Sequence, residues 1–433
     1  MASNDDWREL SVSEFAEVIG GTTPSTSISS HFGGDVPWIT PKDLSNFQGR
    51  YISRGERNIT REGVEAAGLQ ILPKGTVLLS TRAPIGYVAI AANALTTNQG
   101  FRNLVVKSGF EPEYVFYLLK QNTDRLKSFA SGTTFGELSG STLKRLRFSI
   151  PPLSEQRAIA QVLGSLDDNI DLNHRMNQTL EEICRTLFKF WFVDFGPVRA
   201  KAEGRWKKGK SLPGMPVDMW DLWPSEFEES EIGEIPRGWQ VVRLSDRFTT
   251  QYGYTAAASQ EEIGPHLLRV TDINKSHWID WSSVPYCSIS AEELGRYSLC
   301  EGDLVVARMA DPGKAAIVEG EPSAVFASYL VRLKNDSLAR AYYTFYFLGS
   351  DSYLEYAEGA RSGSVQANMN ARVIVDVPYI DPPRPILDAF LDRVLPFRRR
   401  ITANLLENST LAIARDALIP KLLSGEIRVK VDS

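Results

Sequence analysis

The most regular pattern of hydrophobic positions in the chain follows a pair of prolines at 151–152. From Leu153 to Phe192 the sequence contains one glycine and no proline. Apolar residues there recur at alternating steps of three and four, which is the spacing of a coiled-coil seam. This seam runs through Ile159, Leu163, Leu166, Ile170, Asn173, Asn177, Leu180, Cys184, Leu187 and Trp191. The pattern predicts one long helix over residues 153–195.

A second stretch near the C-terminus has the same pattern and predicts another long helix over residues 384–424. Its seam runs through Phe390, Val394, Phe397, Ile401, Asn404, Asn408, Leu411, Arg415, Leu418 and Leu422. The two copies keep a constant offset, which pairs Asn173 with Asn404 and Asn177 with Asn408. Polar seam residues fix register at a cost in stability, so these mid-helix asparagines favour an antiparallel coiled coil. A helix of forty residues is about 60 Å long, which suits a spacer between two modules.

The regions before the two helices also repeat each other. The segment "LPKGTVLLSTRAPIG" (72–86) recurs as "LCEGDLVVARMADPG" (299–313), and "ITPKDL" (39–44) recurs loosely as "LRVTDI" (268–273). Short β-branched runs such as "GTVLLST" and "DLVVAR", bounded by turn residues, predict strands. We therefore expect an α+β fold with two β-rich domains that are related by internal duplication and separated by two long helices in an antiparallel coiled coil.

The expected boundaries follow from these patterns. They are an N-terminal domain (1–152), a first spacer helix (153–195), a linker (196–237), a C-terminal domain (238–383), a second spacer helix (384–424) and a tail (425–433). The linker carries the basic run "RAKAEGRWKKGK" (199–210) and then an acidic stretch, "PSEFEESEIGEIP". Segregated charge with Pro and Gly predicts a connector on the surface. The basic run is either a solvated part of this connector or a contact to DNA.

Composition narrows the class of protein only a little. The chain of 433 residues has 43% hydrophobic and 23% charged residues and a formal net charge of −5, so most of it should fold. Its apolar runs are too short to span a bilayer, and the N-terminal residues show no signal peptide. Three cysteines without a CxxC pair fit a reducing compartment, so we expect a cytoplasmic protein with no membrane partner. A net negative charge does not exclude DNA binding by a local cluster of basic residues.

Three segments resemble catalytic or metal-binding motifs without matching them. "DPPR" (381–384) lacks the aromatic residue with which amino-methyltransferases stack a flipped base. "DPGK" (311–314) has Arg308 where a phosphate-binding loop needs glycine. His266, His277, Cys287 and Cys300 could in principle bind zinc, but spacings of about ten residues do not select for a zinc site. We therefore predict a non-catalytic binder or scaffold with no metal.

Several segments together resemble the specificity (S) subunits of type I restriction-modification systems. The first helix, "IPPLSEQRAIAQVLGSLDDNIDLNHRMNQTLEE", carries the resemblance, with "FGPV" and "PSEFEESEIGEIPRGW" after it. "GGTTPSTS…GGDVPWITPKDL" and "LPKGTVLLSTRAPIGYVAI" are similar to a target recognition domain of that family. The second half is less similar, because "IDPPRPILDAFLDRV" lacks the PP-L-x-EQ helix start.

The resemblance implies a non-catalytic subunit with two target recognition domains, each of which reads one half of a bipartite DNA site. The implied partners are double-stranded DNA, two methyltransferase subunits that modify adenine with S-adenosylmethionine, and in some complexes two motor-nuclease subunits that use ATP and Mg. No cofactor is expected on this chain itself. The alternative that the residues leave open is a stand-alone DNA-binding scaffold or regulator that forms homodimers through its helices.

Candidate DNA contacts are polar or aromatic residues on predicted loops at corresponding places in the two copies. Arginine suits guanine edges, Asn and Gln suit adenine, and hydroxyls and lysines hold phosphates. In the first domain the candidates are Thr40, Lys42, Arg82, Asn98, Gln99, Ser131 and Thr133. In the second they are Tyr252, Arg269, Arg308, Arg361, Ser362, Gln366 and Asn368. The competing interpretation for each of them is an exposed turn residue.

Overall fold

The computed structural model describes residues 6–45, 47, 49–82, 84–130, 136–320, 322–362 and 369–429, without the side chains of 361 and 362. The chain divides into two compact units. The first combines residues 1–172 with 407–433, and the second spans 173–406. Each unit therefore contains one β-rich domain and a section of each long helix.

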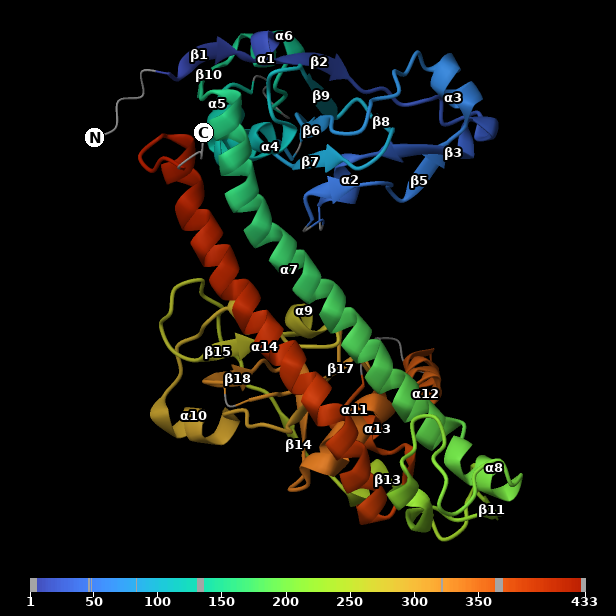
Figure 1. Ribbon diagram of the computed structural model, residues 1–433. Coiled ribbons are helices and arrows are strands. Elements are labelled where there is room, and N and C mark those ends of the chain that lie inside the picture. The colour runs from blue at the N-terminus through green and yellow to red at the C-terminus, as the bar shows by residue number, and fades with distance from the viewer. Residues whose placement is uncertain are drawn as a thin grey trace. The chain divides into compact units, whose positions relative to one another are not determined.

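The β-rich domain of the first unit is built on a five-stranded sheet in the order β2-β9-β6-β7-β4 (Figure 1). A three-stranded sheet, β5-β3-β8, and the pair β1-β10 complete it. The strands are β1 (Arg8–Ser11), β2 (Ala16–Gly20), β3 (Phe32–Ile39), β4 (Tyr51–Ile52), β5 (Arg57–Ile59), β6 (Val77–Ser80), β7 (Val88–Ala91), β8 (Thr96–Thr97), β9 (Phe101–Val106) and β10 (Arg147–Ile150). Every residue of β6 is buried because this strand lies inside the sheet with both faces covered.

Short helices in the first unit cover the sheets. They are α1 (Val12–Phe15), α2 (Pro41–Leu44), α3 (Arg61–Ala66), α4 (Pro112–Gln121), α5 (Thr123–Ser128) and α6 (Gly140–Arg145). In α4, six consecutive residues from Tyr114 to Leu119 are buried, so every face of the middle of this helix is covered, whereas Lys120 and Gln121 at its end are exposed. The core also takes in Ile159 and Leu163 from the first long helix and Ile419 and Leu422 from the second.

The second unit repeats this topology. Its main sheet has the order β14-β19-β16-β17, beside the parallel pair β15-β18 and the antiparallel pair β13-β20. The strands are β11 (Phe227–Ser230), β12 (Gly233–Pro236), β13 (Gln240–Arg243), β14 (Thr249–Tyr252), β15 (His266–Leu268), β16 (Leu304–Ala307), β17 (Ala315–Ile317), β18 (Ala324–Phe326), β19 (Leu330–Lys334) and β20 (Pro378–Asp381). The helices are α8 (Gly196–Ala202), α9 (Val270–Ile273), α10 (Ala291–Tyr297), α11 (Leu338–Leu348), α12 (Asp351–Ser362) and α13 (Ala371–Val375).

Individual hydrogen bonds confirm that the domains are copies of one design. Gly21 and Gly253 follow equivalent strands, and each donates its backbone N–H to the first residue of the next strand in the sheet, Phe101 or Leu330. A Cβ at Gly21 would lie 2.1 Å from a backbone oxygen, and one at Gly253 would lie 2.2 Å from another. Both positions therefore need glycine for the same reason, which is the close approach of a neighbouring backbone.

The two long helices are α7 (Leu153–Phe188), continued by a π-helical turn at Lys189–Val193, and α14 (Arg384–Leu423). Within the first unit, Asp167 of α7 contacts Arg415 of α14. Within the second, residues 177 and 181 of α7 contact 404 and 398 of α14. Rising numbers on one helix meet falling numbers on the other, so the sections run antiparallel in each unit (Figure 1). The α+β fold class is therefore confirmed.

One buried contact joins two of the four seam asparagines. In the second unit Asn404 Nδ2 donates to Asn177 Oδ1 at 2.7 Å, and both side chains are buried. Asn173 belongs to the second unit and Asn408 to the first. The role of all four in fixing register stays a prediction.

The structure corrects the expectation that residues 196–237 form a surface connector. This segment contains α8 and the β11-β12 hairpin, and its side chains Trp206, Met215, Met219 and Trp223 are buried in the core of the second unit. Charge segregation misled the prediction because the apolar residues lie between the charged ones. The basic residues Lys207, Lys208 and Lys210 are exposed, as either interpretation of the run requires. Among the described residues, no helix is long and apolar enough to cross a membrane.

Candidate nucleic-acid interface

In the first domain, four strands end at the same edge of the fold, and the loops after them are joined by backbone hydrogen bonds. Thr22 N donates to Thr97 O (3.0 Å), Asn98 N to Ile39 O (2.9 Å) and Thr81 N to Gly100 O (2.8 Å). We call the segments 21–24, 40–44, 81–82, 84–86 and 98–100 the first edge. Because each loop is tied to its neighbours, the edge presents its polar side chains from a fixed backbone.

Five of the candidate DNA contacts lie on the first edge. Thr40 caps α2, and its hydroxyl donates to Asp43 at 2.7 Å. Lys42 is exposed and forms a 2.7 Å ion pair with Glu56, whose hydrogen bond raises the pKa of the ammonium. The Oδ1 atom of Asn98 accepts from Gly100 N, whereas Gln99 is exposed beside Thr23. Lys42 and Gln99 are therefore the most accessible side chains of this set.

Arg82 shares an acidic partner with a residue that the sequence did not single out. Arg82 Nε lies 3.0 Å from Glu137, and Arg102 Nη2 lies 3.1 Å from the same carboxylate. Arg102 is the second residue of β9, inside the stretch "TTNQGFRN". The sequence could have indicated Arg102 as a candidate DNA contact, because it lies two residues after the loop 98–100. Glu137 neutralises part of this pair, so DNA would have to compete with it for the two guanidinium groups.

The second domain has an equivalent edge. Tyr254 N donates to Phe326 O (2.7 Å), Ala327 N to Leu268 O (2.8 Å) and Arg308 N to Tyr329 O (3.0 Å), which repeat the three bonds of the first edge. We call the loops 253–256, 269–273, 308–313 and 327–329 the second edge. Tyr329 is 57% exposed there and was not predicted. The sequence feature that could have indicated Tyr329 as a DNA contact is its position in the turn before β19.

Arg308 and Tyr252 form an aromatic–cation pair at the second edge. The Arg308 guanidinium lies 4.9 Å from the centre of the Tyr252 ring, and the Tyr252 hydroxyl accepts from Ala371 N at 3.0 Å. Among the described residues, Arg308 Nε is buried without a hydrogen-bond partner. A guanidinium that lies over a ring is restrained in position before any ligand arrives.

Arg269 is less free than Arg308. It caps α9, and its guanidinium bonds both carboxylate oxygens of Asp272, at 2.9 and 2.8 Å. These hydrogen bonds raise the pKa of Arg269. Because a bidentate pair satisfies the same donors that would read a base, Arg269 is a weaker candidate for base recognition.

The expectation that candidates occupy corresponding places holds for one pair and is wrong for another. Thr40 and Arg269 are equivalent, since each precedes a short helix and bonds the acidic residue three positions on. Arg308 is equivalent to Thr81, because both donate a backbone N–H to the turn before the next strand. Arg82 is thus one position further along its loop than Arg308, so the two loops direct different side chains outward.

The remaining candidates lie outside the described part of the chain. They are Ser131, Thr133, Gln366 and Asn368, together with the side chains of Arg361 and Ser362. Over the ranges that the structure covers, no three His, Cys, Asp or Glu side chains lie close enough to hold a metal ion. His266 instead contacts the Val284 carbonyl at 2.8 Å, and Arg384 of "DPPR" pairs with Asp388.

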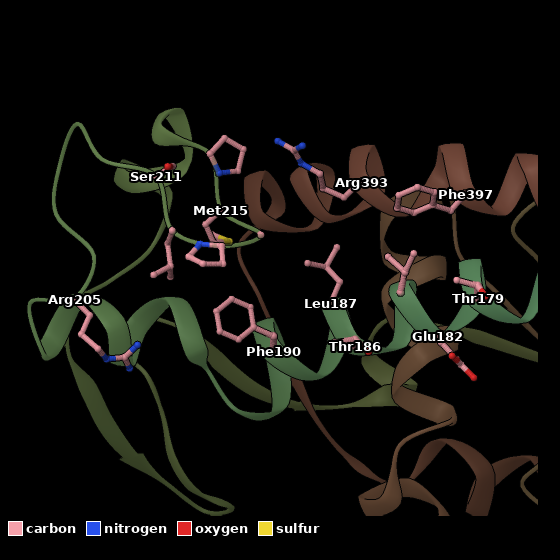
Figure 2. A pocket seen from close by; sticks show the side chains of 15 residues that line it. Thr179, Glu182, Thr186, Leu187, Phe190, Arg205, Ser211, Met215, Arg393 and Phe397 are labelled. Carbon is pink, nitrogen blue, oxygen red and sulfur yellow. The ribbon is translucent and has the colours of Figure 1, made fainter. Parts of the chain in front are cut away.

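An apolar groove of about 1030 Å³ lies in the second unit between the two long helices and the segment 211–216. Figure 2 shows Leu187 of α7, Phe190 of the π-helical turn after it and Phe397 of α14 on its walls, with Met215 opposite. The lining is mostly aliphatic and aromatic. The charged side chains of the lining are Glu182, Arg205 and Arg393.

Comparison with known proteins points to one family. Residues 4–182 match the type I restriction modification DNA specificity domain. The chain is 37% identical over 432 residues to the type I restriction enzyme MjaIX specificity subunit of Methanocaldococcus jannaschii, covering 98% of this chain and 94% of that protein. It is 27% identical over 357 residues to the HindI specificity subunit of Haemophilus influenzae, covering 73% and 77%.

A solved structure shares the fold. The S subunit of the type I restriction-modification system from M. genitalium aligns with a TM-score of 0.58 over 98% of this chain and 97% of that one, at 13% identity. The identity to the jannaschii protein extends over both β-rich domains and both long helices. The chain therefore belongs to the family of specificity subunits of type I restriction-modification systems.

Proposed function

We propose that this non-catalytic DNA specificity subunit reads a bipartite site, and that each β-rich domain recognises one half of it through its edge. The observation that carries the proposal is the comparison of the two edges. They share the same backbone hydrogen bonds but carry different side chains, with Thr40 and Arg269 at one equivalent position and the buried Thr81 and the partly exposed Arg308 at another. A common scaffold with different polar residues would read two different half-sites in the same manner.

The chemistry of the edges suits DNA. Exposed Lys42 can hold a phosphate, Gln99 can read adenine, and Arg308 can donate two parallel hydrogen bonds to guanine. The chain as a whole is acidic, with a formal net charge of −5. Such a chain would repel DNA except where cations gather, so contact confined to the edges also limits non-specific binding.

The long helices would set the distance between the half-sites. At 1.5 Å per residue the 36 residues of α7 extend about 54 Å, and the 40 residues of α14 about 60 Å. In this proposal the bases between the half-sites are not read. Their number follows from helix length rather than from any side chain.

The catalytic steps belong to partner subunits. We infer two methyltransferase subunits, which bring S-adenosylmethionine to an adenine in each half-site, and motor-nuclease subunits with ATP and Mg that join to cut unmodified DNA. This chain would bind no cofactor. Its own task is to hold the DNA in register so that the adenines reach the partner sites.

An exchange of domains tests this division of labour. Residues 1–152 are replaced by the corresponding domain of another family member, and genomic methylation is sequenced in cells that contain the methyltransferase subunits. We expect one half of the methylated motif to change and the other half to remain. A motif that stays whole, or that changes in both halves, would contradict the proposal.

A deletion tests the spacer. Removing one heptad from both α7 and α14 shortens each by about 10 Å, which corresponds to roughly three base pairs. We expect the same two half-sites with a shorter gap. The control is a variant with one heptad, residues 257–263, removed from a loop of the second domain outside the second edge, which should leave the gap unchanged.

A further inference from the structure

Each unit contains a cluster of three charged groups that joins the β-rich domain to both long helices. In the first unit the centre is Asp167 of α7, which lies 2.6 Å from Arg415 of α14 and 3.9 Å from Arg50 of the domain. Tyr117 also donates to Asp167 at 2.5 Å. Asp167 is 6% exposed and Arg50 is 4% exposed, so the cluster is buried.

In the second unit the three groups that join the domain to both helices have the opposite signs. Further partners differ, because Arg50 also pairs with Asp168 and Glu113 in the first unit, and Glu181 also pairs with Arg185 in the second. The centre is Arg398 of α14, which lies 2.6 Å from Glu181 of α7 and 2.7 Å from Glu319 of the domain. Arg398 is fully buried, and its guanidinium also donates to the His277 carbonyl. An anion with two cations in the first unit thus becomes a cation with two anions in the second.

The two centres occupy equivalent positions of the duplicated helix. The offset that pairs Asn173 with Asn404 also pairs Asp167 with Arg398. As a result the contacts between the helices join acids of α7, Asp167 and Glu181, to bases of α14, Arg415 and Arg398. Glu181 also pairs with Arg185 of its own helix, and Arg415 with Asp416 of its own helix. Each acid of one helix meets a base of the other.

A pairing of like helices would bring like charges together. If α7 met α7 of a second chain in the same register, Asp167 of that chain would replace Arg398 opposite Glu181. If α14 met α14, Arg398 of the second chain would replace Asp167 opposite Arg415. Two-fold symmetry would create each clash twice, and a buried like-charge pair strongly opposes association.

We propose that the two clusters of opposite sign are an assembly code, which pairs α7 with α14 and rejects pairing of either helix with its own kind. The code matters most during synthesis, because α7 is complete before the second domain and α14 exist. Its apolar stripe is then exposed to neighbouring nascent chains. With the proposed function as a premise, the code also keeps the DNA site asymmetric, since a dimer through α7 would present two copies of the same domain.

The test uses full-length chains with reversed charges. Variant A carries Glu181→Arg, which sets an arginine against Arg398. Variant B carries Arg398→Glu and Glu319→Arg, which sets a glutamate against Glu181 while keeping the contact to the domain matched. We expect each alone to melt about 10 °C or more below the wild type, because each leaves buried like charges.

Refolding A and B together from denaturant should restore both contacts by exchange of helices. The arginine introduced into α7 of A then meets the glutamate introduced into α14 of B, and the unchanged Glu181 of B meets the unchanged Arg398 of A. We expect a 1:1 complex with twice the 48.3 kDa mass of one chain, measured by light scattering, and a melting temperature near that of the wild type. All three substitutions in one chain should give a monomer with similar stability.

The control is Glu182→Arg, the same change of charge at the exposed neighbouring residue, which should behave as the wild type. The code is overturned if A or B alone melts like the wild type, if their mixture gives no complex, or if the combined variant is not rescued. Because mass and melting temperature involve no DNA, failure here is distinct from failure of the proposed DNA recognition.

Discussion

The two β-rich domains keep the same backbone and differ in the side chains that the backbone presents. Gly21 and Gly253 occur at the same place because a Cβ there would collide with a neighbouring carbonyl oxygen. Thr81 and Arg308 are also equivalent positions, because each donates its backbone N–H to the turn before the next strand, but their side chains differ. After a duplication, positions that hold strands together are constrained by geometry, whereas positions on the edges are free to change. This difference indicates where specificity resides.

The domains also differ in how they are attached. The core of the second unit incorporates the segment 196–237, whose Trp223 lies 5.2 Å from Trp191 and 5.8 Å from Trp239 between ring centres. The described residues of the first unit include no such segment. The second domain is therefore fixed by an aromatic cluster as well as by its charged cluster, and the predictions below test the consequences.

The largest expected effect is on that aromatic cluster. Trp223→Ala removes a side chain that is 3% exposed, so we expect it to lower the free energy of unfolding by about 3–5 kcal/mol. Denaturant unfolding of the full chain measures the loss. Lys208→Ala, an exposed change in the same segment, is the control and should cost nearly nothing. Equal effects would mean that the segment is a surface connector after all.

The next effect concerns base discrimination by two arginines of the second edge. Arg308→Ala should reduce discrimination at one base pair by about 1–3 kcal/mol, because its guanidinium is oriented by Tyr252 and one nitrogen lacks a partner among the described residues. Arg269→Ala should have a smaller effect, since Asp272 already holds that guanidinium. Competition binding with single-base variants of the methylated site measures both. The reverse order of effects would place the base-reading position at Arg269.

A smaller effect concerns His277, whose backbone carbonyl accepts a hydrogen bond from Arg398 of the second charged cluster. Burial, with Arg185, Lys314 and Arg398 nearby, lowers the pKa of His277 to about 4. The unfolded chain takes up this proton near pH 6.5 and the folded chain only near pH 4, so stability should fall as pH decreases through this window. The ring is partly exposed, which limits the loss to about 1–2 kcal/mol. In His277→Gln the melting temperature should depend less on pH between about pH 6.5 and 4. At about pH 8 it should equal that of the wild type.

The smallest effect concerns the first edge. Lys42 is exposed and paired with Glu56, so Lys42→Ala should weaken binding to all DNA sequences alike. If Lys42 holds one phosphate, the slope of log affinity against log salt should become shallower by about one. Lys74→Ala, another exposed lysine of the same domain, is the control. A change in the methylated motif would instead make Lys42 a base reader.

The sequence predicted the architecture well because the relevant signals are local and periodic. The heptad spacing from Ile159 to Trp191 predicts a helix, and the copy from Phe390 to Leu422 predicts a second one. Each apolar seam needs another helix to bury it, so the two helices are expected to pair. The repeated "LPKGTVLLSTRAPIG" and "LCEGDLVVARMADPG" indicated two domains of one design before any strand pairing was known. The same periodicity indicated nothing about residues 196–237, where four buried side chains are spread among charged ones.

Single side chains at the edges were harder to place. A shift of one residue separates Arg82 from the equivalent of Arg308. The repeat contained this information, because "LPKGTVLLSTRAPIG" (72–86) set against "LCEGDLVVARMADPG" (299–313) aligns Arg308 with Thr81. Arg269 had the right place and the right chemistry, yet Asp272, three residues on, occupies its guanidinium. The sequence shows that Arg269 and Asp272 are three residues apart, but it does not show that their side chains pair.

By itself, the sequence determined the two long helices, the duplication and the family of this protein, since each depends on residues that are neighbours or that repeat. Only the tertiary structure decided which charges meet. Asp167 and Arg415, or Glu181 and Arg398, lie far apart along the chain, and the heptad spacing does not show which turns of the two helices meet. They become partners because antiparallel helices bring distant turns to the same level, where burial makes the sign of each charge decisive.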